Sequence, residues 1–528
     1  MSALVGFDVR ALLASEAVAA GTGLGLLWLG GPWQAAAAVA VVVLLAGTVT
    51  VKRHSAARWA ALGWQWLWHR KNVLGAALPA PVDTDFDGSV VGVRLHAGTL
   101  TSMIAVAGSP HTATFLERTR TASTTNTVPM SVLAPLVEQF GLAVGIEVVS
   151  AGQRRAMTGS YAALYEKIIG TRPVAAQRRT WLILRVDVVK SIQGLTTRKS
   201  LFTALAAATE RCARQLDEAG CRARPCTADD ITEAERLLLG PGSTEVEDRW
   251  SHIQSAAGNV ATYVVHARDL PERPIDRLWI MHANAVAHSV HLKPTETGPQ
   301  MAVSVRIETV QHKNFDVPEV FSRIPGEQGK ALRAARASAE RVPHLEYRPA
   351  VDLNLHAGPS GVLLGRTVDD KTPILLPLTD PLRSTTVSVA ANPTLVRQYV
   401  LRAEGTGERI AVYTPNPMAW ANVGRSSRIW IAPSPQTEPP GPVTMVVSDG
   451  LKAPAIAAST VITVEPVLEA AEAKNRQKVA GTVEQHVDVA ITEHDNNQLT
   501  VGTQAESWTI EPVYYADEAN FLNEPTYV

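Results

Sequence analysis

One acidic segment of the sequence approximates a calcium-binding motif. Asp83-Thr84-Asp85-Phe86-Asp87-Gly88 matches the first half of an EF-hand loop, whose carboxylates would ligate Ca²⁺. Position twelve of that loop must supply a bidentate glutamate, and Arg94 stands there instead. The segment is therefore expected to be a polar turn that leads into a strand.

Two glycine-containing segments lack the features of a phosphate-binding loop. Gly326–Ala331 is similar to the end of a P-loop, but Ile324 replaces the first glycine and Ala331 replaces the hydroxyl that holds Mg²⁺. Gly405-Thr406-Gly407 follows a predicted helix, whereas a dinucleotide fingerprint places its glycines before one. These glycines are expected to end that helix.

The remaining polar residues do not form a predicted site. His282 and His288 lie on one face of a predicted strand but roughly 20 Å apart at about 3.3 Å per residue, too far to share a metal ion. Asp369-Asp370 beside Lys371 is typical of a solvated turn. The sequence therefore predicts no catalytic residue, no cofactor site and no metal site.

Composition restricts the class of protein. The 528 residues include 49 Lys+Arg and 50 Asp+Glu, so a global electrostatic attraction to nucleic acid is excluded and no nucleic-acid partner is expected. The low charged fraction, 19%, indicates that some apolar surface faces lipid or a partner. An odd number of cysteines argues for a reducing compartment; they are Cys212, Cys221 and Cys226.

The apolar residues concentrate near the N-terminus. After a short cytosolic segment, 1–8, the stretch Val9–Gly30 is mainly apolar, and Ala35–Val51 has no charged residue. The latter spans roughly 26 Å as a helix, close to the ~30 Å of a bilayer core. We expect residues 9–51 to form a two-helix transmembrane hairpin; a helical hairpin buried in a soluble core is the alternative.

Aromatic and basic residues predict how this hairpin is oriented. Trp28 and Trp33 would lie in an aromatic belt. Because basic residues stay on the cytosolic side, the inner-membrane protein is expected to be two-pass, with both termini and the bulk of the chain cytoplasmic. The residues that predict this orientation are Lys52, Arg53, Arg58, Arg70 and Lys71.

Residues 52–78 contain a tryptophan-rich helix. Trp59, Leu62 and Trp66 share one helical face. The helix is predicted to lie in the lipid headgroup region, held by its indole rings and basic ends. The alternative is a helix that packs against the first cytosolic domain.

The rest of the chain predicts a cytosolic α+β domain over 83–343, a βαβ Rossmann-like module over 344–466 and an acidic tail over 467–528. Within the first domain, a strand hairpin is predicted to turn at His96-Ala97-Gly98, and helices are predicted over 200–217 and 229–239. Residues 486–504 of the tail could form a hairpin around His494-Asp495-Asn496-Asn497. In the second module, strands are predicted at 385–391, 409–414 and 428–431, and helices are predicted between them at 393–404 and 416–423.

The sequence resembles the EccE family of type VII (ESX) secretion machines. The resemblance rests on the hairpin and on spaced structural residues, with no catalytic signature among them: Val91-Gly92-Val93-Arg94, Leu100-Thr101, Val387-Ser388-Val389, Leu395-Val396, Leu401-Arg402-Ala403, Gly405-Thr406-Gly407 and Pro417-Met418-Ala419-Trp420. The acidic tail departs from the family pattern.

The resemblance implies a membrane-anchored α/β (α+β) protein, whose transmembrane hairpin precedes a cytosolic Rossmann-like, glycosyltransferase-like region without enzymatic activity. It further implies a structural subunit that binds EccB, EccC, EccD and the lipid bilayer in a multimeric complex. The alternative function, a membrane-attached glycosyltransferase or nucleotide-sugar binder, rests on the βαβ module and Asp369-Asp370.

Overall fold

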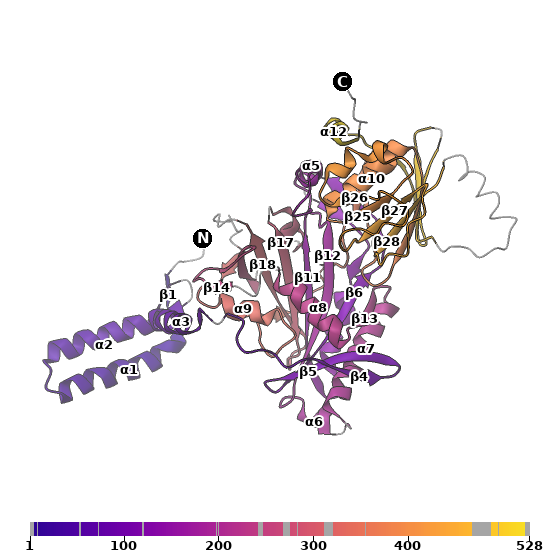
Figure 1. Ribbon diagram of the computed structural model, residues 1–528. Coiled ribbons are helices and arrows are strands. Elements are labelled where there is room, and N and C mark those ends of the chain that lie inside the picture. Colours follow the sequence, from indigo (N-terminus) through magenta and orange to yellow (C-terminus); the bar gives the residue numbers. More distant parts are fainter. Residues whose placement is uncertain are drawn as a thin grey trace.

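The computed structural model describes residues 5–522, apart from 8, 52–53, 72, 119–120, 197, 199, 241–245, 268–274, 282, 311–319, 354, 467–486 and 495. A helical hairpin, α1 (Val9–Trp28) and α2 (Trp33–Thr48), projects from one side of an elongated body (Figure 1). A small sheet of β1 (Val5–Phe7), β2 (Val49–Val51) and β3 (His54–Ser55) lies at its base, followed by α3 (Ala56–His69). Two large sheets make up the body.

The first sheet is antiparallel throughout its main path. Its central strands are long because β11 and β12 pair over ten residue positions, from Val144↔Val186 to Gln153↔Gln177. The order is β14 (Val246–Asp248), β15 (Ile253–Ser255), β16 (Gly258–Val265), β18 (Gln300–Thr309), β17 (Ala285–Lys293), β11 (Leu142–Gln153), β12 (Gln177–Asp187), β6 (Thr99–Gly108), β5 (Ser89–His96) and β4 (Val82–Phe86). Short strands add to it: β10 (Glu138–Gln139), β13 (Arg222–Pro225), β19 (Phe321–Arg323) and β20 (Arg348–Pro349).

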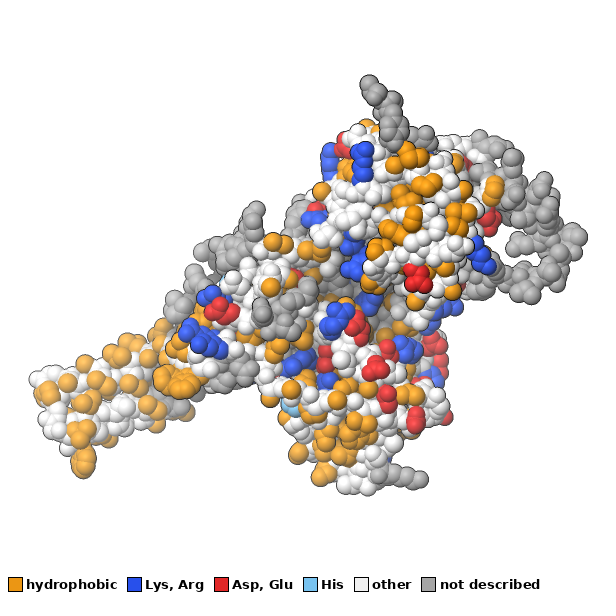
Figure 2. Space-filling view, in the orientation of Figure 1, with side chains coloured by type: hydrophobic (Ala, Val, Ile, Leu, Met, Phe, Trp, Pro, Cys, Tyr) orange, Lys and Arg blue, Asp and Glu red, His pale blue; other side chains and the backbone are white. Residues whose placement is uncertain are grey.

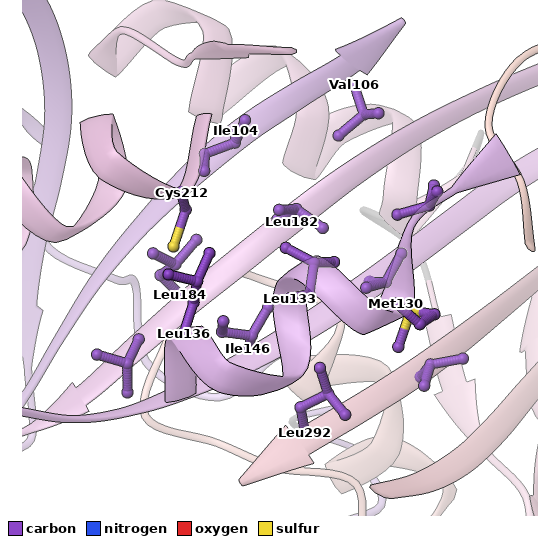
Figure 3. Packing of buried hydrophobic residues seen from close by; sticks show 14 of the residues in the cluster. Ile104, Val106, Met130, Leu133, Leu136, Ile146, Leu182, Leu184, Cys212 and Leu292 are labelled. Carbon is purple, nitrogen blue, oxygen red and sulfur yellow. The ribbon is translucent and has the colours of Figure 1, made fainter. Parts of the chain in front are cut away.

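The sequence of β12 contains a continuous apolar run because this part of the strand is buried on both faces of the sheet. Leu182 and Leu184 point into the larger core beneath α7 (Leu201–Glu218), together with Cys212, whose sulfur lies within the cluster (Figure 3). Trp181 and Ile183 point to the opposite face, where α8 (Ala228–Leu239) covers them. A strand buried on both faces has no polar side, so alternation is lost.

Several local predictions are confirmed. The hairpin turning at His96-Ala97-Gly98 is β5–β6, and the predicted helices 200–217 and 229–239 are α7 and α8. Helix α8 begins with a capping box, in which Thr227 and Asp230 satisfy each other's backbone N–H groups. Three short helices lie against the first sheet: α4 (Met130–Leu133), α6 (Ile192–Thr196) and α9 (Gln328–Ala334). Helix α5 (Ala162–Ile169) packs instead into the hydrophobic core of the second sheet.

The second sheet combines a parallel half with an antiparallel half. The parallel half is β26 (Ile429–Ile431), β25 (Ile410–Tyr413), β27 (Met445–Asp449), β28 (Thr460–Val464), β24 (Thr385–Ala390) and β29 (Val489–Glu493). The antiparallel half is β30 (Leu499–Thr503), β31 (Ser507–Glu511), β22 (Val362–Thr367), β23 (Pro373–Leu376), β7 (Thr114–Arg118) and β8 (Thr121–Ser123). A separate two-stranded sheet pairs β9 (Thr127–Val128) with β21 (Leu355–His356).

The predicted alternation of strands and helices is only partly present. Helix α10 (Pro393–Thr406) follows β24, with Asn392 as its N-cap and Gly407, at φ 113°, as its C-cap. The expected helix at 416–423 is instead two 3₁₀ turns, Pro417–Trp420 and Val423–Arg425. Pro417 and Gly424 leave too short a run for a full α-helix.

The transmembrane part of the predicted fold class is wrong. Two helices do form over the predicted segments, but no helix of the described residues is both long and apolar enough to cross a membrane. Helix α2 has 16 residues, which extend only about 24 Å. Helix α1 is continuous, but the polar residues Ser15, Glu16 and Thr22 interrupt its apolar sequence. The chain is a sheet-rich α+β protein that carries an external helical hairpin.

Residues 487–522, which the sequence predicts to be part of an acidic tail, build part of the second sheet. The hairpin predicted around residues 494–497 is confirmed as β29–β30, and β31 joins it to β22. A 3₁₀ turn, Ala516–Glu518, and α12 (Ala519–Leu522) then close over α10 and α5, where the Phe521 ring lies 5.6 Å from that of Tyr161.

A buried ion pair locks this C-terminal segment. Arg402 Nε and Nη2 donate to the two carboxylate oxygens of Glu518 at 2.9 Å each, and the exposed fractions of the two side chains are 0% and 1%. Gln398 and Tyr161 donate to the same carboxylate. Burial alone would raise the pKa of Glu518, but the hydrogen bond and charge of Arg402 outweigh it and hold the pKa below its ordinary value.

The substitution Glu518→Gln should lower the free energy of unfolding of the region built on the second sheet by about 3–5 kcal/mol, because it leaves Arg402 buried without a counter-charge. The midpoint of chemical unfolding measures the loss. Asp517→Asn is the matched control, since its partner Lys167 is largely exposed and little change is expected. The stabilisation is present above the ordinary carboxyl pKa of about 4.3 and disappears as pH falls through the lowered value. Equal midpoints for both variants at neutral pH would contradict this account.

Candidate interaction site at the helical hairpin

Small residues form the contact between α1 and α2. A Cβ added at Gly23 would lie 3.4 Å from Ala36 O and from Ala40 Cβ, and one added at Gly47 would lie 2.1 Å from Ser15 Oγ. Ala19, Ala36 and Ser15 are buried between the helices. The backbones therefore approach closely, and the large side chains are left on the outside.

The outer surface of the hairpin is consequently apolar. Figure 2 shows hydrophobic side chains along its visible face. At the turn, Trp28 is 86% and Trp33 is 69% exposed, and along the helices Leu24 and Val42 are 67% and 64% exposed. A contiguous apolar surface of this kind is typical of a site that contacts another apolar surface.

Helix α3 fixes the base of the hairpin to the body through three tryptophans. The rings of Trp59 and Trp66 lie 5.9 and 5.7 Å from that of Trp250, and Trp66 Nε1 donates to Asp248 O at 3.2 Å. Leu62 is buried beside them. These contacts match the alternative prediction of a helix packed against the first body.

The opposite side of α3 faces outward. Trp64 and Trp68 are 66% and 71% exposed, and their rings lie 5.9 Å apart. This exposed pair continues the apolar character of the hairpin onto its base.

The basic residues predicted to orient the hairpin lie around the same base. Arg58, Arg70 and Lys71 are exposed, and the Arg70 guanidinium lies over the Trp66 ring at 5.7 Å. Lys52 and Arg53 lie outside the described residues.

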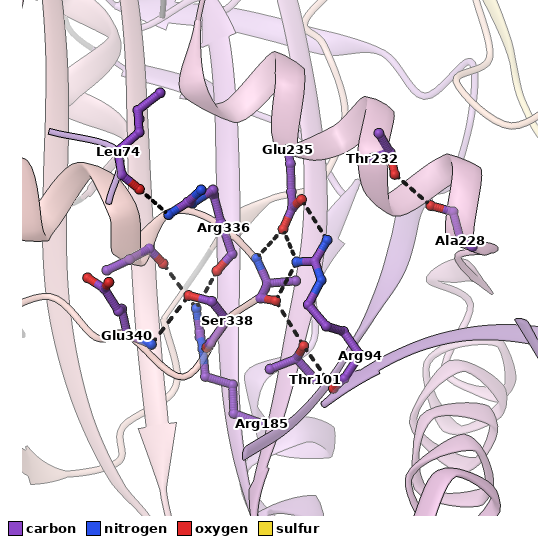
Figure 4. Close-up of polar contacts among 12 residues, drawn as sticks. Leu74, Arg94, Thr101, Arg185, Ala228, Thr232, Glu235, Arg336, Ser338 and Glu340 are labelled. Atoms are coloured by element: carbon purple, nitrogen blue, oxygen red, sulfur yellow. Dashed lines mark hydrogen bonds and ion pairs between the residues drawn. The ribbon is translucent and has the colours of Figure 1, made fainter. Parts of the chain in front are cut away.

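Residues 333–338, which we term the clasp, hold the chain that leaves α3. Arg333 Nη1 donates to Val73 O at 2.8 Å. Arg336 Nη2 donates to Leu74 O, also at 2.8 Å (Figure 4). Both acceptors are backbone carbonyls, so these contacts fix the path of the main chain and do not depend on the side chains of residues 73 and 74.

Two buried arginines hold the clasp against the first sheet. Arg94 donates to both oxygens of Glu235, at 2.6 and 3.0 Å, and to Ala337 O at 2.7 Å. Arg185 donates to Glu147 at 2.6 Å. It also donates to Ser338 O at 2.9 Å (Figure 4). The hairpin is thus connected through the clasp to the centre of the sheet.

Electrostatics strengthens the second of these pairs. Burial would raise the pKa of Glu147, yet the neighbouring His291 and Arg185 lower it to about 2. The carboxylate therefore stays charged at neutral pH, as its arginine partner requires.

Sequence reasoning did not find this network. The sequence patterns that include Arg94, the incomplete calcium loop and the family resemblance, assign it no partner. A charged residue inside the apolar strand 91–95 is the signal that indicates a buried counter-charge. Its counter-charge, Glu235, is 141 positions away, so no local spacing could reveal it.

The rejected motifs have structural roles. Asp83 Oδ1 accepts from Ala228 N at the start of α8, and Gly326–Ala331 leads into α9, where a Cβ at Gly326 would meet the Trp250 ring. Asp370 accepts hydrogen bonds from Thr367 and Thr372 in an exposed turn. Within the described part of the chain, no group of three or more potential metal ligands comes together.

Comparisons with known proteins find similarity to one family. A family model described as "Putative type VII ESX secretion system translocon, EccE" matches residues 174–265, which include β12, α7, α8 and Trp250. The ESX-2 secretion system protein EccE2 of Mycobacterium tuberculosis is 28% identical over 449 residues, 82% of this chain and 82% of the relative. These matches support an EccE-type ESX component.

Two further EccE relatives share the similarity. The ESX-5 protein EccE5 of Mycobacterium marinum is 28% identical over 57% of this chain and 79% of its own length. The ESX-1 protein EccE1 of Mycolicibacterium smegmatis is 28% identical over 76% of this chain and 82% of its own length. The similarity therefore extends to proteins of three ESX systems and, in the longest match, covers most of this chain.

Replacing both clasp arginines, Arg333→Ala with Arg336→Ala, should free the segment after α3, because the carbonyls of Val73 and Leu74 lose their donors. Chymotrypsin cleavage after Trp68 or Leu74 should accelerate about tenfold, as expected when local opening becomes easier by about 1.4 kcal/mol. Arg236→Ala, at an exposed arginine of α8, is the control and should leave cleavage unchanged. Unchanged cleavage in the double variant would show that the clasp does not hold this segment.

Proposed function

We propose that this EccE-type chain is a non-catalytic structural subunit of a type VII secretion inner-membrane complex, which supports assembly and stability of the export channel. The similarity to EccE components of the ESX-1, ESX-2 and ESX-5 systems carries the proposal. The physical support is an apolar hairpin fixed firmly to a large folded body, an arrangement suited to bracing neighbouring subunits.

The alternative function, a glycosyltransferase or nucleotide-sugar binder, has no support. Its acidic pair lies in an exposed turn in which Lys371 contacts Glu511, and the relatives are named as secretion-system proteins. In the second sheet, Pro393 opens α10 at the position where a nucleotide-binding turn would present backbone N–H groups.

The partners in this proposal are EccB, EccC, EccD and lipid, within a multimeric complex, and the body lies on the cytoplasmic side. Trp28 and Trp33 at the hairpin turn would contact the apolar parts of these partners. Arg58, Arg70 and Lys71, together with Lys52 and Arg53, would face anionic lipid headgroups. This gives the exposed residues of the hairpin and its base one coherent role.

The experiment replaces outward side chains of the hairpin, Leu24→Ser and Val42→Ser, and measures how much intact complex is recovered on native gels after detergent extraction. Both side chains are largely exposed on the hairpin, so it should fold while losing apolar contact with its neighbours. We expect recovery of EccB, EccC and EccD with the tagged subunit to fall at least about tenfold.

The matched control places serine at two exposed apolar positions of the body, Val189→Ser and Ile192→Ser, which are 77% and 57% exposed. This variant should assemble normally. Normal recovery of the complex with the hairpin variant would reject the hairpin as an assembly element, and equal losses in both variants would show that the effect is not specific to it.

A further inference from the structure

One buried carboxyl group lies at the point where α3 joins the body. Asp248 belongs to the edge strand β14, and its exposed fraction is 6%. Its backbone O accepts from Trp66 Nε1 at 3.2 Å, and its backbone N donates to Arg70 O at 3.3 Å. This single residue therefore attaches the C-terminal end of α3 to the first sheet.

The side chain of Asp248 lies among apolar residues. Asp248 is opposite Ile253 in β15, and Ile253 is opposite Val260 in β16, so the three side chains share one face of the sheet. The two apolar residues are buried together with Val73, from the segment after α3, and Leu332, from α9. The carboxyl group thus borders an apolar cluster that includes the chain leaving the hairpin.

The carboxyl group has few polar partners. Asp248 Oδ2 accepts from Gly329 N, near the start of α9, at 3.3 Å, and a Cβ at Gly329 would lie only 2.8 Å from this oxygen. Within the described residues, Oδ1 is buried without a hydrogen-bond partner and Asp248 forms no ion pair. The charged form is therefore disfavoured, because burial removes its water and one long hydrogen bond replaces little of that hydration.

One cation from α9 acts on this carboxyl group. The charge of Arg333 favours the ionised form of Asp248, as does the N–H of Gly329, but burial is the larger effect and raises the pKa of Asp248 to about 6. The Arg333 guanidinium is hydrogen-bonded to Glu340 at 2.9 Å and to Val73 O at 2.8 Å. Turning toward Asp248 would require it to leave the clasp contacts.

The other charged or titratable groups near Asp248 have contacts of their own. On β14 itself, Glu247 and Arg249 form an ion pair at 2.9 Å, and their side chains are 51% and 50% exposed. The turn to β15 carries His252, whose ring contacts the neighbouring serine. At the end of α3, the Arg70 guanidinium lies over an indole ring at 5.7 Å. Asp248 pairs with none of these groups.

The protonation state of Asp248 therefore affects the attachment. When the segment after α3 opens, water reaches the carboxyl group and its pKa returns toward the ordinary value of about 3.9. Because the closed state has the higher pKa, its added stability is fully present below about pH 4 and is lost as pH rises through about 6. Above that range the closed state has to bury a charge.

We propose that Asp248 makes the attachment of the hairpin pH-sensitive: a proton on its carboxyl group tightens the contact between α3, the segment after it and the first sheet, and loss of that proton loosens the contact. The inference rests on the proposed function for its consequence, since a looser hairpin would brace neighbouring subunits less firmly. The pH response itself is a property of the single chain.

The test is hydrogen–deuterium exchange of the purified full-length protein, read by mass spectrometry at residues 66–70 at about pH 5 and about pH 7.5, with intrinsic exchange rates corrected for. We expect these amides to be about tenfold more protected at the lower pH, the ratio predicted by a pKa of about 6 closed and about 3.9 open. Asp248→Asn keeps an acceptor for Gly329 N but cannot ionise, so it should show the higher protection at both pH values.

Glu247→Gln and His252→Gln are the matched controls, because they change titratable groups on or next to β14; both variants should keep the wild-type pH response. Equal wild-type protection at the two pH values, or a pH response that persists in Asp248→Asn, would overturn the proposal. The wild-type comparison involves no substitution, so it is decisive even if a variant folds poorly.

The two proposals can fail separately. A flat wild-type exchange profile would overturn the pH response and leave the assembly role untouched, because that role is judged from recovery of the complex with the Leu24→Ser and Val42→Ser variant. Normal recovery with that variant would reject the assembly role without changing the exchange profile.

Discussion

The architecture depends on buried arginines, each of which donates hydrogen bonds both to a carboxylate and to backbone carbonyls. Arg94 and Arg185 hold the clasp in this way, and Arg402 holds the C-terminal segment through Glu518, Val513 O and Leu363 O. A buried guanidinium without such partners would be strongly destabilising, so these contacts restrict the surrounding chain to one arrangement. Segments without regular secondary structure thereby acquire fixed positions.

The hairpin and the body are therefore mechanically connected. The close seam between α1 and α2 leaves large apolar side chains outside, and Trp59, Trp66 and Trp250 fix its base. From that base, the clasp leads to the central strands of the first sheet. A partner bound to the hairpin would thus be held rigidly relative to the whole protein, as a structural subunit requires.

The sequence predicted those features that depend on local patterns. Periodicity located α7 and α8, and the turn residues located the β5–β6 hairpin. It could not predict the partners of Arg94 or Arg402, which come from distant segments, or the burial of Glu518 within a stretch rich in acidic residues. Apolar composition alone also could not distinguish a membrane-spanning hairpin from an exposed one, because both lack charged faces.

The order of strands in the second sheet has a consequence for biosynthesis. Strands β29–β31, contributed by residues 489–511, connect the parallel half to the antiparallel half, and the latter contains β7 and β8 from residues 114–123. A ribosome must therefore release almost the entire chain before this sheet can be completed. Until then, both halves expose unpaired strand edges, which makes the nascent chain a natural client for chaperones.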